Sequence, residues 1–377
     1  MMRPTQVGFE LTKACNYQCK HCFSRAGNPL SPELTLEEVQ HILDEIYDVG
    51  ALFINVTGGE PVLRPDIIEI LEYTMNFGEA QIYHFQTNGT AWTDDFLDQF
   101  LRICSKQPAI DVQISIDGYD RASYVEARGG PPENFDRIVN LIRTLRNHDI
   151  EVNTLMTITK STLPFAIKTA RFAAEELKVN QFLMIPLFPA GRAVPYYGEV
   201  MFSRELWKDF LVAMTRIKKD QVWGPYTQKV EVGFFTLYDF VLPLEEAGLK
   251  NEIELIWKFS EEEFLQDAKR PTICESGYTD LFINAQGVVF PCTPSIDSDF
   301  VAGNALTESL SSIWEGSPII NWFRSEATDV CQKEPCKSCT HKTVCGGGCR
   351  LSALSLTGDR NSLDPACPVV AAHLEES

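Results

Sequence analysis

The sequence predicts an α/β protein in which a partial, TIM-like (β/α)6 barrel is followed by a small cysteine-rich domain. Short β-rich runs alternate with amphipathic helical patterns through residues 6–187, which is typical of stacked βαβ units. The six units are fewer than the eight of a closed barrel, so we expect an open one. Eight of the twelve cysteines lie after residue 271, which sets the carboxyl-terminal part apart.

The elements of the barrel follow from local patterns. The expected strands are residues 6–12, 51–57, 80–86, 110–116, 150–158 and 180–187. The expected helices are residues 35–49, 65–77, 93–104, 134–147 and 162–177. Thr35 is the expected N-cap of the first helix, and Glu38 completes a capping box. In the third helix, Cys104 shares a face with Phe96 and Phe100, which indicates a buried core position without a chemical role.

The chain divides into three predicted parts. The barrel occupies residues 1–202. Residues 203–270 are rich in aromatic side chains, contain the acidic run 261–263 and show no catalytic pattern, so we interpret them as a bridging segment. Residues 271–377 form the cysteine-rich domain.

The overall composition limits the classes of function. The net charge of −19 argues against a nucleic-acid partner, because Lys and Arg carry that binding. The amino terminus lacks a signal peptide, and no run of about 18 apolar residues could span a membrane, so we expect a soluble, cytoplasmic protein. Cytoplasmic thiols stay reduced, and Cys-x-x-Cys spacings therefore favour metal ligation over disulfides.

Three cysteines follow the first expected strand. Three residues separate Cys15 from Cys19, and two residues separate Cys19 from Cys22. A cubic iron–sulfur cluster takes four thiolates, so three would leave one iron open to a substrate. The segment Cys-Asn-Tyr-Gln-Cys-Lys-His-Cys resembles the cluster loop of the radical S-adenosylmethionine (SAM) enzymes. The alternative is a zinc knuckle.

Motifs after the next strands are expected at the same rim of the barrel. Gly58 and Gly59 let the backbone approach a ligand closely and offer it amides and carbonyls, although a bare turn is the alternative. Thr-Gly-Gly-Glu-Pro at 57–61 resembles the SAM-binding motif of the same family. This resemblance implies that Gly58, Gly59 and Glu60 hold the methionyl ammonium group.

The resemblance also implies two further SAM contacts. Ser115 would contact the ribose, and Arg128 would pair with the methionyl carboxylate, unless Arg128 is simply a surface residue. Second-rank candidates at the rim are Thr87, Asn88 and Asp117. Tyr17 and His21 either stack on adenine or pack against the cluster, and Arg192 is expected near the substrate cavity. No catalytic residue is assigned beyond the cluster and the SAM site.

The carboxyl-terminal cysteines resemble the SPASM domain, which binds auxiliary iron–sulfur clusters, and a zinc ribbon is the alternative. The resemblance implies an outer cluster on Cys336, Cys339, Cys345 and Cys367. It implies an inner cluster on Cys274, Cys292 and Cys349. The fourth inner ligand is either Cys331 or absent, which would leave an open iron. Residues 284–292 read as a hairpin that delivers Cys292 from its second strand.

Together the resemblances imply a radical SAM oxidoreductase with one SAM-binding [4Fe-4S] cluster and two auxiliary clusters, both expected to be [4Fe-4S]. Reductive cleavage of SAM would give a 5′-deoxyadenosyl radical that removes a substrate hydrogen. The leading expectation is oxidative modification or crosslinking of a ribosomally synthesised peptide. The alternatives are small-molecule or cofactor biosynthesis such as haem-type decarboxylation, formylglycine formation in sulfatases, and a non-catalytic electron carrier.

The resemblance also bears on partners. The first strand begins within the first ten residues, so we expect a separate leader-peptide recognition protein or direct docking of the peptide. A flavodoxin- or ferredoxin-type protein would supply the electron. No membrane partner is expected.

Overall fold

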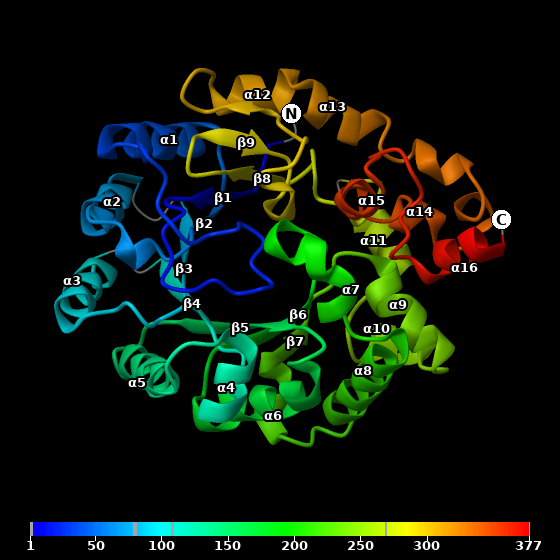
Figure 1. Cartoon of the computed structure of the whole chain (residues 1–377), viewed down its shortest axis with the longest axis horizontal. Coiled ribbons are helices and arrows are strands. Elements are labelled where there is room, and N and C mark those ends of the chain that lie inside the picture. The colour runs from blue at the N-terminus through cyan, green and yellow to red at the C-terminus, as the bar shows by residue number, and fades with distance from the viewer. Residues whose placement is uncertain (1–2, 78–80, 107–108, 268–269, 377) are drawn as a thin grey trace.

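The computed structural model describes residues 3–77, 81–106, 109–267 and 270–376. Within these ranges one ten-stranded sheet runs in the order β10-β9-β8-β1-β2-β3-β4-β5-β6-β7. Figure 1 shows its central strands arranged in an arc, with helices α1 to α6 on the outside and the loop after β1 inside. No helix in the described ranges is both long and apolar enough to cross a bilayer.

The six expected strands are present as parallel neighbours. They are β1 (Gln6–Glu10), β2 (Phe53–Thr57), β3 (Ile82–Thr87), β4 (Ile110–Ser115), β5 (Val152–Ile158) and β6 (Gln181–Pro186). Residue 80, at the start of the third expected strand, lies outside the described residues. Apolar strand side chains such as Phe9, Ile54 and Val112 have no solvent exposure and belong to one apolar cluster, so the sheet lies in the core. The prediction of a partial parallel barrel is confirmed.

The helices outside this arc agree with the predicted ranges with one omission. They are α1 (Leu36–Asp48), α2 (Ile67–Thr74), α3 (Asp94–Cys104), α4 (Arg121–Arg128), α5 (Glu133–Asn147) and α6 (Ala166–Arg171). Thr35 and Glu38 form the expected capping box, and Cys104 is buried. Helix α4 was not predicted; it has only eight residues, and its start is fixed by a capping box between Asp120 and Ser123.

Helix α7 (Tyr197–Val200) ends the barrel part. The bridging region contains α8 (Arg204–Lys219), β7 (Val230–Val232), α9 (Leu237–Glu246), α10 (Lys250–Leu255) and α11 (Glu261–Asp267). Strand β7 pairs in parallel with β6 and extends the barrel by one strand. A three-residue strand is too short to show a period in the sequence, so it was missed.

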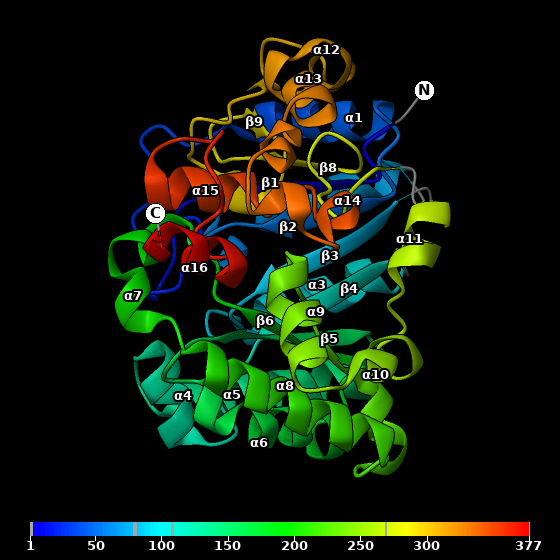
Figure 2. The same ribbon diagram turned by 90° about the vertical axis from the view of Figure 1, so that its right-hand side faces the viewer.

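The carboxyl-terminal region begins with the predicted hairpin, β8 (Asp280–Ile283) and β9 (Val288–Phe290), and continues through β10 (Gly303–Asn304). Its helices are α12 (Leu310–Gly316), α13 (Pro318–Ser325), α14 (Lys342–Cys345), α15 (Arg350–Thr357) and α16 (Pro368–Glu376). Figure 2 shows α14 to α16 stacked above the bridging helices α8 and α9.

Strand β8 pairs in parallel with β1, which the sequence did not predict. Gly8 makes room for this contact, because a Cβ there would lie 2.4 Å from the ring of Phe282. The two strands therefore end at the same rim, so that the loop after β1 and the hairpin turn after β8 are neighbours. The division of the chain at residues 202 and 270 stays a prediction.

Candidate active site

The loop after β1, residues 12–27, carries the three leading cysteines and is called the cysteine loop below. The glycine motif after β2 is bonded to it: the Gly59 amide donates to the Thr12 carbonyl at 2.8 Å, and the Glu60 amide donates to the Ala14 carbonyl at 2.7 Å. A Cβ on Gly59 would lie 2.3 Å from the Ala14 oxygen. The close approach predicted for this motif is thus made to the cysteine loop, and these two amides are not available to a ligand.

Glu60 lies buried between the ends of β2 and β3. Its carboxylate accepts hydrogen bonds from the Thr87 hydroxyl and the Asn88 amide, each at 2.7 Å. Burial raises the pKa of Glu60 to about 7, and these hydrogen bonds oppose the rise. The Asn88 side chain in turn donates to Asn16 in the cysteine loop at 2.9 Å. Glu60 is therefore part of a network that joins three loops of the rim.

Arg128, at the end of α4, is a buried side chain with 9% exposure and not a surface residue. Its Nε donates to Asp117, and the other oxygen of Asp117 accepts from the Thr157 amide at 3.0 Å. The guanidinium lies close enough to Cys19 to lower the pKa of that thiol, against the larger effect of burial, which raises it. Ser115, the last residue of β4, is half-buried at the same rim.

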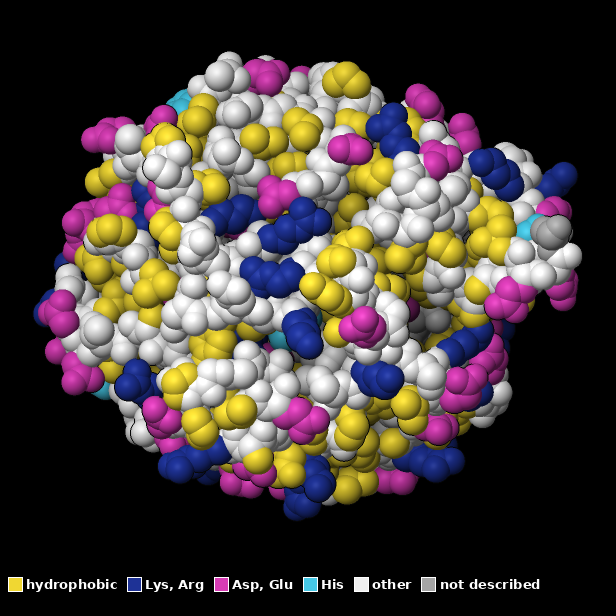
Figure 3. All heavy atoms as spheres, viewed as in Figure 1, with side chains coloured by type: hydrophobic (Ala, Val, Ile, Leu, Met, Phe, Trp, Pro, Cys, Tyr) yellow, Lys and Arg dark blue, Asp and Glu magenta, His cyan; other side chains and the backbone are white. Residues whose placement is uncertain are grey.

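A cavity of about 550 Å³ opens beside the cysteine loop and Arg128. Its lining includes Cys19, Lys20, His21 and Lys160. Figure 3 shows Lys and Arg side chains gathered near the middle of this face, although the chain as a whole carries a net charge of −19. Burial lowers the pKa of His21 to about 4, so its imidazole is neutral. Of the predicted site residues, Cys19, His21 and Arg128 line this cavity, which is large enough for a nucleoside-sized ligand.

Two side chains fix the cysteine loop in place. Arg192, after β6, donates from its guanidinium to the carbonyls of Cys19 and Ala26, and its own amide donates to the Cys22 carbonyl at 2.9 Å. Arg192 therefore holds the loop, and its predicted place near the substrate cavity stays a prediction. Tyr17 is buried and accepts a hydrogen bond from Asn134 of α5 at 2.6 Å, which supports the packing role over stacking on adenine.

The three leading thiols are free and partly buried. Cys15 Sγ accepts a hydrogen bond from the Tyr17 amide at 3.4 Å, and Cys22 Sγ lies 3.6 Å from the Ser24 hydroxyl. Donors aimed at sulfur are typical of iron–sulfur ligation, so this donor set fits a cluster. In the described ranges, no group of three or more Cys, His, Asp or Glu residues has the arrangement of a site for a single metal ion.

A second set of thiols lines a small cavity near the carboxyl terminus. These outer thiols are Cys336, Cys339, Cys345 and Cys367, the four residues that the sequence groups together. Cys331 lies with them: burial and then the charge of Cys331 raise the pKa of Cys336 to about 11. Cys331 Sγ is also 3.3 Å from the position that a Cβ on Gly347 would take. The structure thus places Cys331 beside the outer thiols.

The inner thiols are Cys274, Cys292 and Cys349. Burial raises the pKa of Cys292 and Cys349 most, and the charge of Cys274 raises both further. Hydrogen bonds from Ser276 to Cys274 and Cys292 oppose this effect. Among the described residues, the charged neighbours of Cys331 are Arg350, Cys339 and Lys342 and not the inner thiols, so the fourth ligand of the inner set stays unassigned.

Comparison with known families agrees with this geometry. The model of the radical SAM superfamily matches residues 9–164. The model of the SPASM iron–sulfur cluster-binding domain matches residues 274–340, ending before Cys345. The chain is a radical SAM protein with a SPASM domain.

Known proteins resemble this radical SAM protein over nearly all of its length. AdoMet-dependent heme synthase of Methanosarcina barkeri is 27% identical over 368 residues, 97% of this chain and 96% of that protein. PqqA peptide cyclase of Granulibacter bethesdensis is 26% identical over 378 residues, 97% of this chain and 87% of that protein. The structure of Streptococcus suis SuiB bound to precursor peptide SuiA has a TM-score of 0.74 at 18% identity, covering 98% of this chain and 76% of that one.

Some residues of this radical SAM protein that shape the sites were not found from sequence. Asp364 is fully buried and accepts from the Cys349 amide at 2.9 Å and from Tyr238 at 2.7 Å, so it orders the segment between inner and outer thiols. His341 forms hydrogen bonds with Glu245 and Glu261 of the bridging region. These contacts join segments that are far apart in the chain, so no local sequence pattern predicts them.

The cysteine loop also approaches the inner thiols. Phe23 follows Cys22 and meets the ring of Phe282 edge-on at 6.2 Å. Phe23, Cys274 and Cys349 all pack against one apolar cluster that includes Phe300 and Trp322. The cysteine loop and two of the inner thiols therefore share an apolar contact surface.

Proposed function

We propose that this enzyme cleaves SAM reductively at a cluster held by Cys15, Cys19 and Cys22, and uses the resulting radical to modify a ribosomally synthesised peptide oxidatively. The proposed SAM cleavage is supported by the arrangement of residues at the barrel rim. Three free thiols stand on one loop, the Gly-Gly-Glu-Pro segment is bonded to that loop, and a buried arginine faces the adjoining cavity. When bound, a reduced [4Fe-4S] cluster supplies the electron that splits the sulfonium of SAM.

The residues of the chain would bind and orient SAM. Arg128 is held in place by Asp117 and presents a forked donor to a carboxylate. Ser115, at the end of β4, would contact the ribose. The carbonyls of Gly58 and Gly59 and the carboxylate of Glu60 are the acceptors proposed for the methionyl ammonium group. Burial of these groups within the barrel rim would keep water away from a reactive radical.

We also propose two auxiliary [4Fe-4S] clusters, one on the outer thiols and one on the inner thiols. The outer cavity is lined by four cysteines, which fits a fully ligated cluster. The inner set offers three cysteines. An electron from the substrate radical could pass to either auxiliary cluster. A flavodoxin- or ferredoxin-type donor and a separate leader-peptide recognition protein complete the proposal, with parts bounded at residues 202 and 270.

The peptide substrate is supported by the likeness to PqqA peptide cyclase over 97% of this chain. A second candidate, haem-type decarboxylation of a small molecule, is favoured by the similar likeness to AdoMet-dependent heme synthase, which spans 96% of that protein. Formylglycine formation has no observation in its favour beyond the shared fold.

The test is anaerobic turnover of the reconstituted holoenzyme with dithionite and SAM, followed by chromatography for 5′-deoxyadenosine. Release of this product supports the enzyme, and its absence after full reconstitution favours an electron carrier. Two arms then separate the substrates: a short precursor peptide encoded beside this gene, and an iron porphyrin bearing propionate groups. Loss of two hydrogens from the peptide supports peptide maturation, whereas loss of carbon dioxide from the porphyrin supports decarboxylation.

A further inference from the structure

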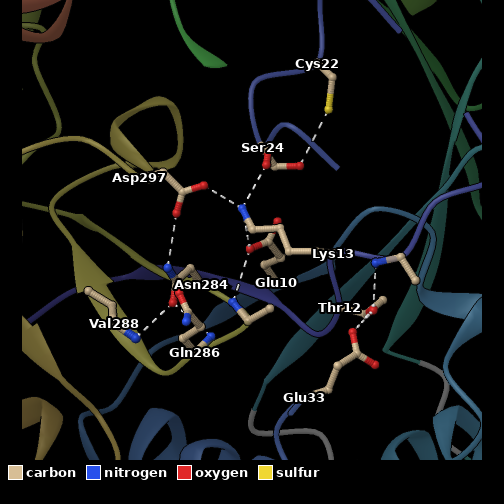
Figure 4. Close-up of polar contacts among 12 residues, drawn as sticks. Glu10, Thr12, Lys13, Cys22, Ser24, Glu33, Asn284, Gln286, Val288 and Asp297 are labelled. Atoms are coloured by element: carbon tan, nitrogen blue, oxygen red, sulfur yellow. Dashed lines mark hydrogen bonds and ion pairs between the residues drawn. The ribbon is translucent and has the colours of Figure 1, made fainter. Parts of the chain in front are cut away.

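Lys13 occupies a buried junction at the start of the cysteine loop. Its ammonium group lies 2.6 Å from Asp297 Oδ2, 3.2 Å from Glu10 Oε2 and 2.8 Å from the Ser24 carbonyl to which it donates. The Lys13 side chain is 11% exposed and that of Glu10 is fully buried. Figure 4 shows these side chains converging from the cysteine loop and from the hairpin region.

The acceptors of Lys13 stand on both sides of the contact between β1 and β8. Glu10 is the last residue of β1, and its Oε2 also accepts from the Ala285 amide in the hairpin turn at 3.1 Å. Asp297 follows the hairpin and accepts from the Asn284 side chain at 3.2 Å. The junction therefore ties the cysteine loop to the SPASM hairpin at two points.

Lys13 also closes the cysteine loop on itself. Its ammonium group meets the carbonyl of Ser24, whose hydroxyl lies 3.6 Å from Cys22 Sγ. Its backbone carbonyl accepts from the Gly27 amide at 2.8 Å. The two ends of the loop that carries Cys15, Cys19 and Cys22 are thus held together by one residue.

The charges at this junction depend on Lys13. One ammonium group contacts two carboxylates, and Glu10 Oε1 is buried without a hydrogen-bond partner among the described residues. Removing one partner of a buried ion pair leaves an uncompensated charge, which is strongly destabilising. Burial raises the pKa of Glu10 to about 7 against the opposing charge of Lys13, so without Lys13 the Glu10 carboxylate would take up a proton, and the ionic contact that joins the cysteine loop to Asp297 would be lost.

We propose that Lys13 is a positioning residue through which the SPASM hairpin holds the cysteine loop in its ligating conformation. This inference rests on the proposed cluster at Cys15, Cys19 and Cys22. It adds that Asp297, 284 residues away in the chain, acts on that loop through Lys13.

The test compares Lys13→Met, Asp297→Asn and the double variant as anaerobic holoenzymes. Two readouts report on the cysteine loop: the rate at which a ferrous chelator removes iron from the cluster, and amide hydrogen exchange over residues 13–27. We expect Lys13→Met to speed iron removal and amide exchange roughly 10-fold or more, which is the size of effect seen when a partner of a metal ligand is lost. Asp297→Asn should speed both processes by a smaller factor. The double variant should match Lys13→Met alone, because both changes break one linkage. Lys13→Arg should restore part of the protection.

The matched control is Lys219→Met, which breaks the exposed pair of Lys219 with Glu252 at 2.9 Å. It should leave both readouts unchanged. Effects of Lys13→Met and Asp297→Asn that multiply in the double variant, or a Lys13→Met no different from the control, would overturn the inference. Hydrogen exchange requires neither turnover nor iron, so a protein that fails to cleave SAM still tests it. Asp297→Asn keeps the inference testable should Lys13→Met fail to fold.

Discussion

Glu60 accepts a hydrogen bond from the backbone amide of Asn88 at 2.7 Å, which joins the end of β2 to the end of β3. The second oxygen of the same carboxylate accepts from the Thr87 hydroxyl. Both carboxylate oxygens of Glu60 therefore stabilise the rim of the barrel beside the cysteine loop. This structural role is separate from any contact between the carboxylate and a ligand.

Replacing Glu60 should slow SAM cleavage, and the alanine substitution should slow it more than the glutamine substitution. Glu60→Gln keeps one acceptor oxygen but turns the other into a donor facing Thr87 or Asn88, while Glu60→Ala removes both. We expect formation of 5′-deoxyadenosine to fall about 10-fold in Glu60→Gln and about 100-fold in Glu60→Ala, as for lost outer-shell partners. Chromatographic assay of the anaerobic reaction measures both, and equal rates in Glu60→Ala and the parent enzyme would refute the role.

Gly59 is predicted to be intolerant of any side chain. A Cβ there would lie 2.3 Å from the Ala14 carbonyl oxygen, so the cysteine loop would have to move. Gly59→Ala should cost about 1–3 kcal/mol of unfolding free energy, as overpacking does, and should lower the iron content after reconstitution. Gly198→Ala is the control, because a Cβ there meets nothing within 4 Å. Urea unfolding and iron analysis of both variants would contradict this account if they came out alike.

The placement of Cys331 predicts a difference between two serine substitutions. Cys336 lines the outer cavity, whereas Cys331 lies beside it and not in its lining. Cys336→Ser should therefore lose the outer cluster, and Cys331→Ser should keep the iron content of the parent enzyme. Iron and sulfide analysis with Mössbauer spectra of ⁵⁷Fe-reconstituted protein distinguishes them. If Cys331→Ser lost one whole cluster, Cys331 would be a cluster ligand and the prediction would be wrong.

Asp239 in α9 is predicted to make stability depend on pH. Burial raises its pKa from 3.8 to about 7, and the nearby Asp364 adds to the rise. A carboxyl group that binds its proton more tightly when folded stabilises the protein at low pH, so unfolding free energy falls as pH rises from about 4 to about 7. Asp239→Asn should flatten this slope. Urea titrations at several pH values measure it, and parallel slopes for the two proteins would rule out the assignment.

The strands and most helices of the barrel could be predicted because their apolar periods are local. The same holds for the Thr35 capping box and for the hairpin that leads to Cys292. Parallel pairing of β8 with β1 could not be predicted, because it joins segments about 270 residues apart and depends on Phe282 packing over Gly8. Tertiary contacts of this kind leave no period in the sequence.

The leading cysteines stood out by their spacing, and the resemblance to the radical SAM and SPASM families supplied the role of the Gly-Gly-Glu-Pro segment and the grouping of the other cysteines. The supporting contacts were not predicted: Arg192, expected near the substrate cavity, holds the cysteine loop, and Asp364 orders the segment between the SPASM thiols. Lysine, arginine and aspartate are common on surfaces, and only burial in the fold distinguishes these from solvated ones.

The central claim is that the cluster on Cys15, Cys19 and Cys22 keeps one iron for SAM. Electron–nuclear double resonance of the reduced holoenzyme, with SAM labelled by ¹⁵N in the amino group and ¹⁷O in the carboxylate, tests it most directly. The account predicts hyperfine coupling from both labels, absent when the three cysteines are changed to alanine. Zinc at these thiolates, or a cluster signal that shows no coupling to either label, would contradict it.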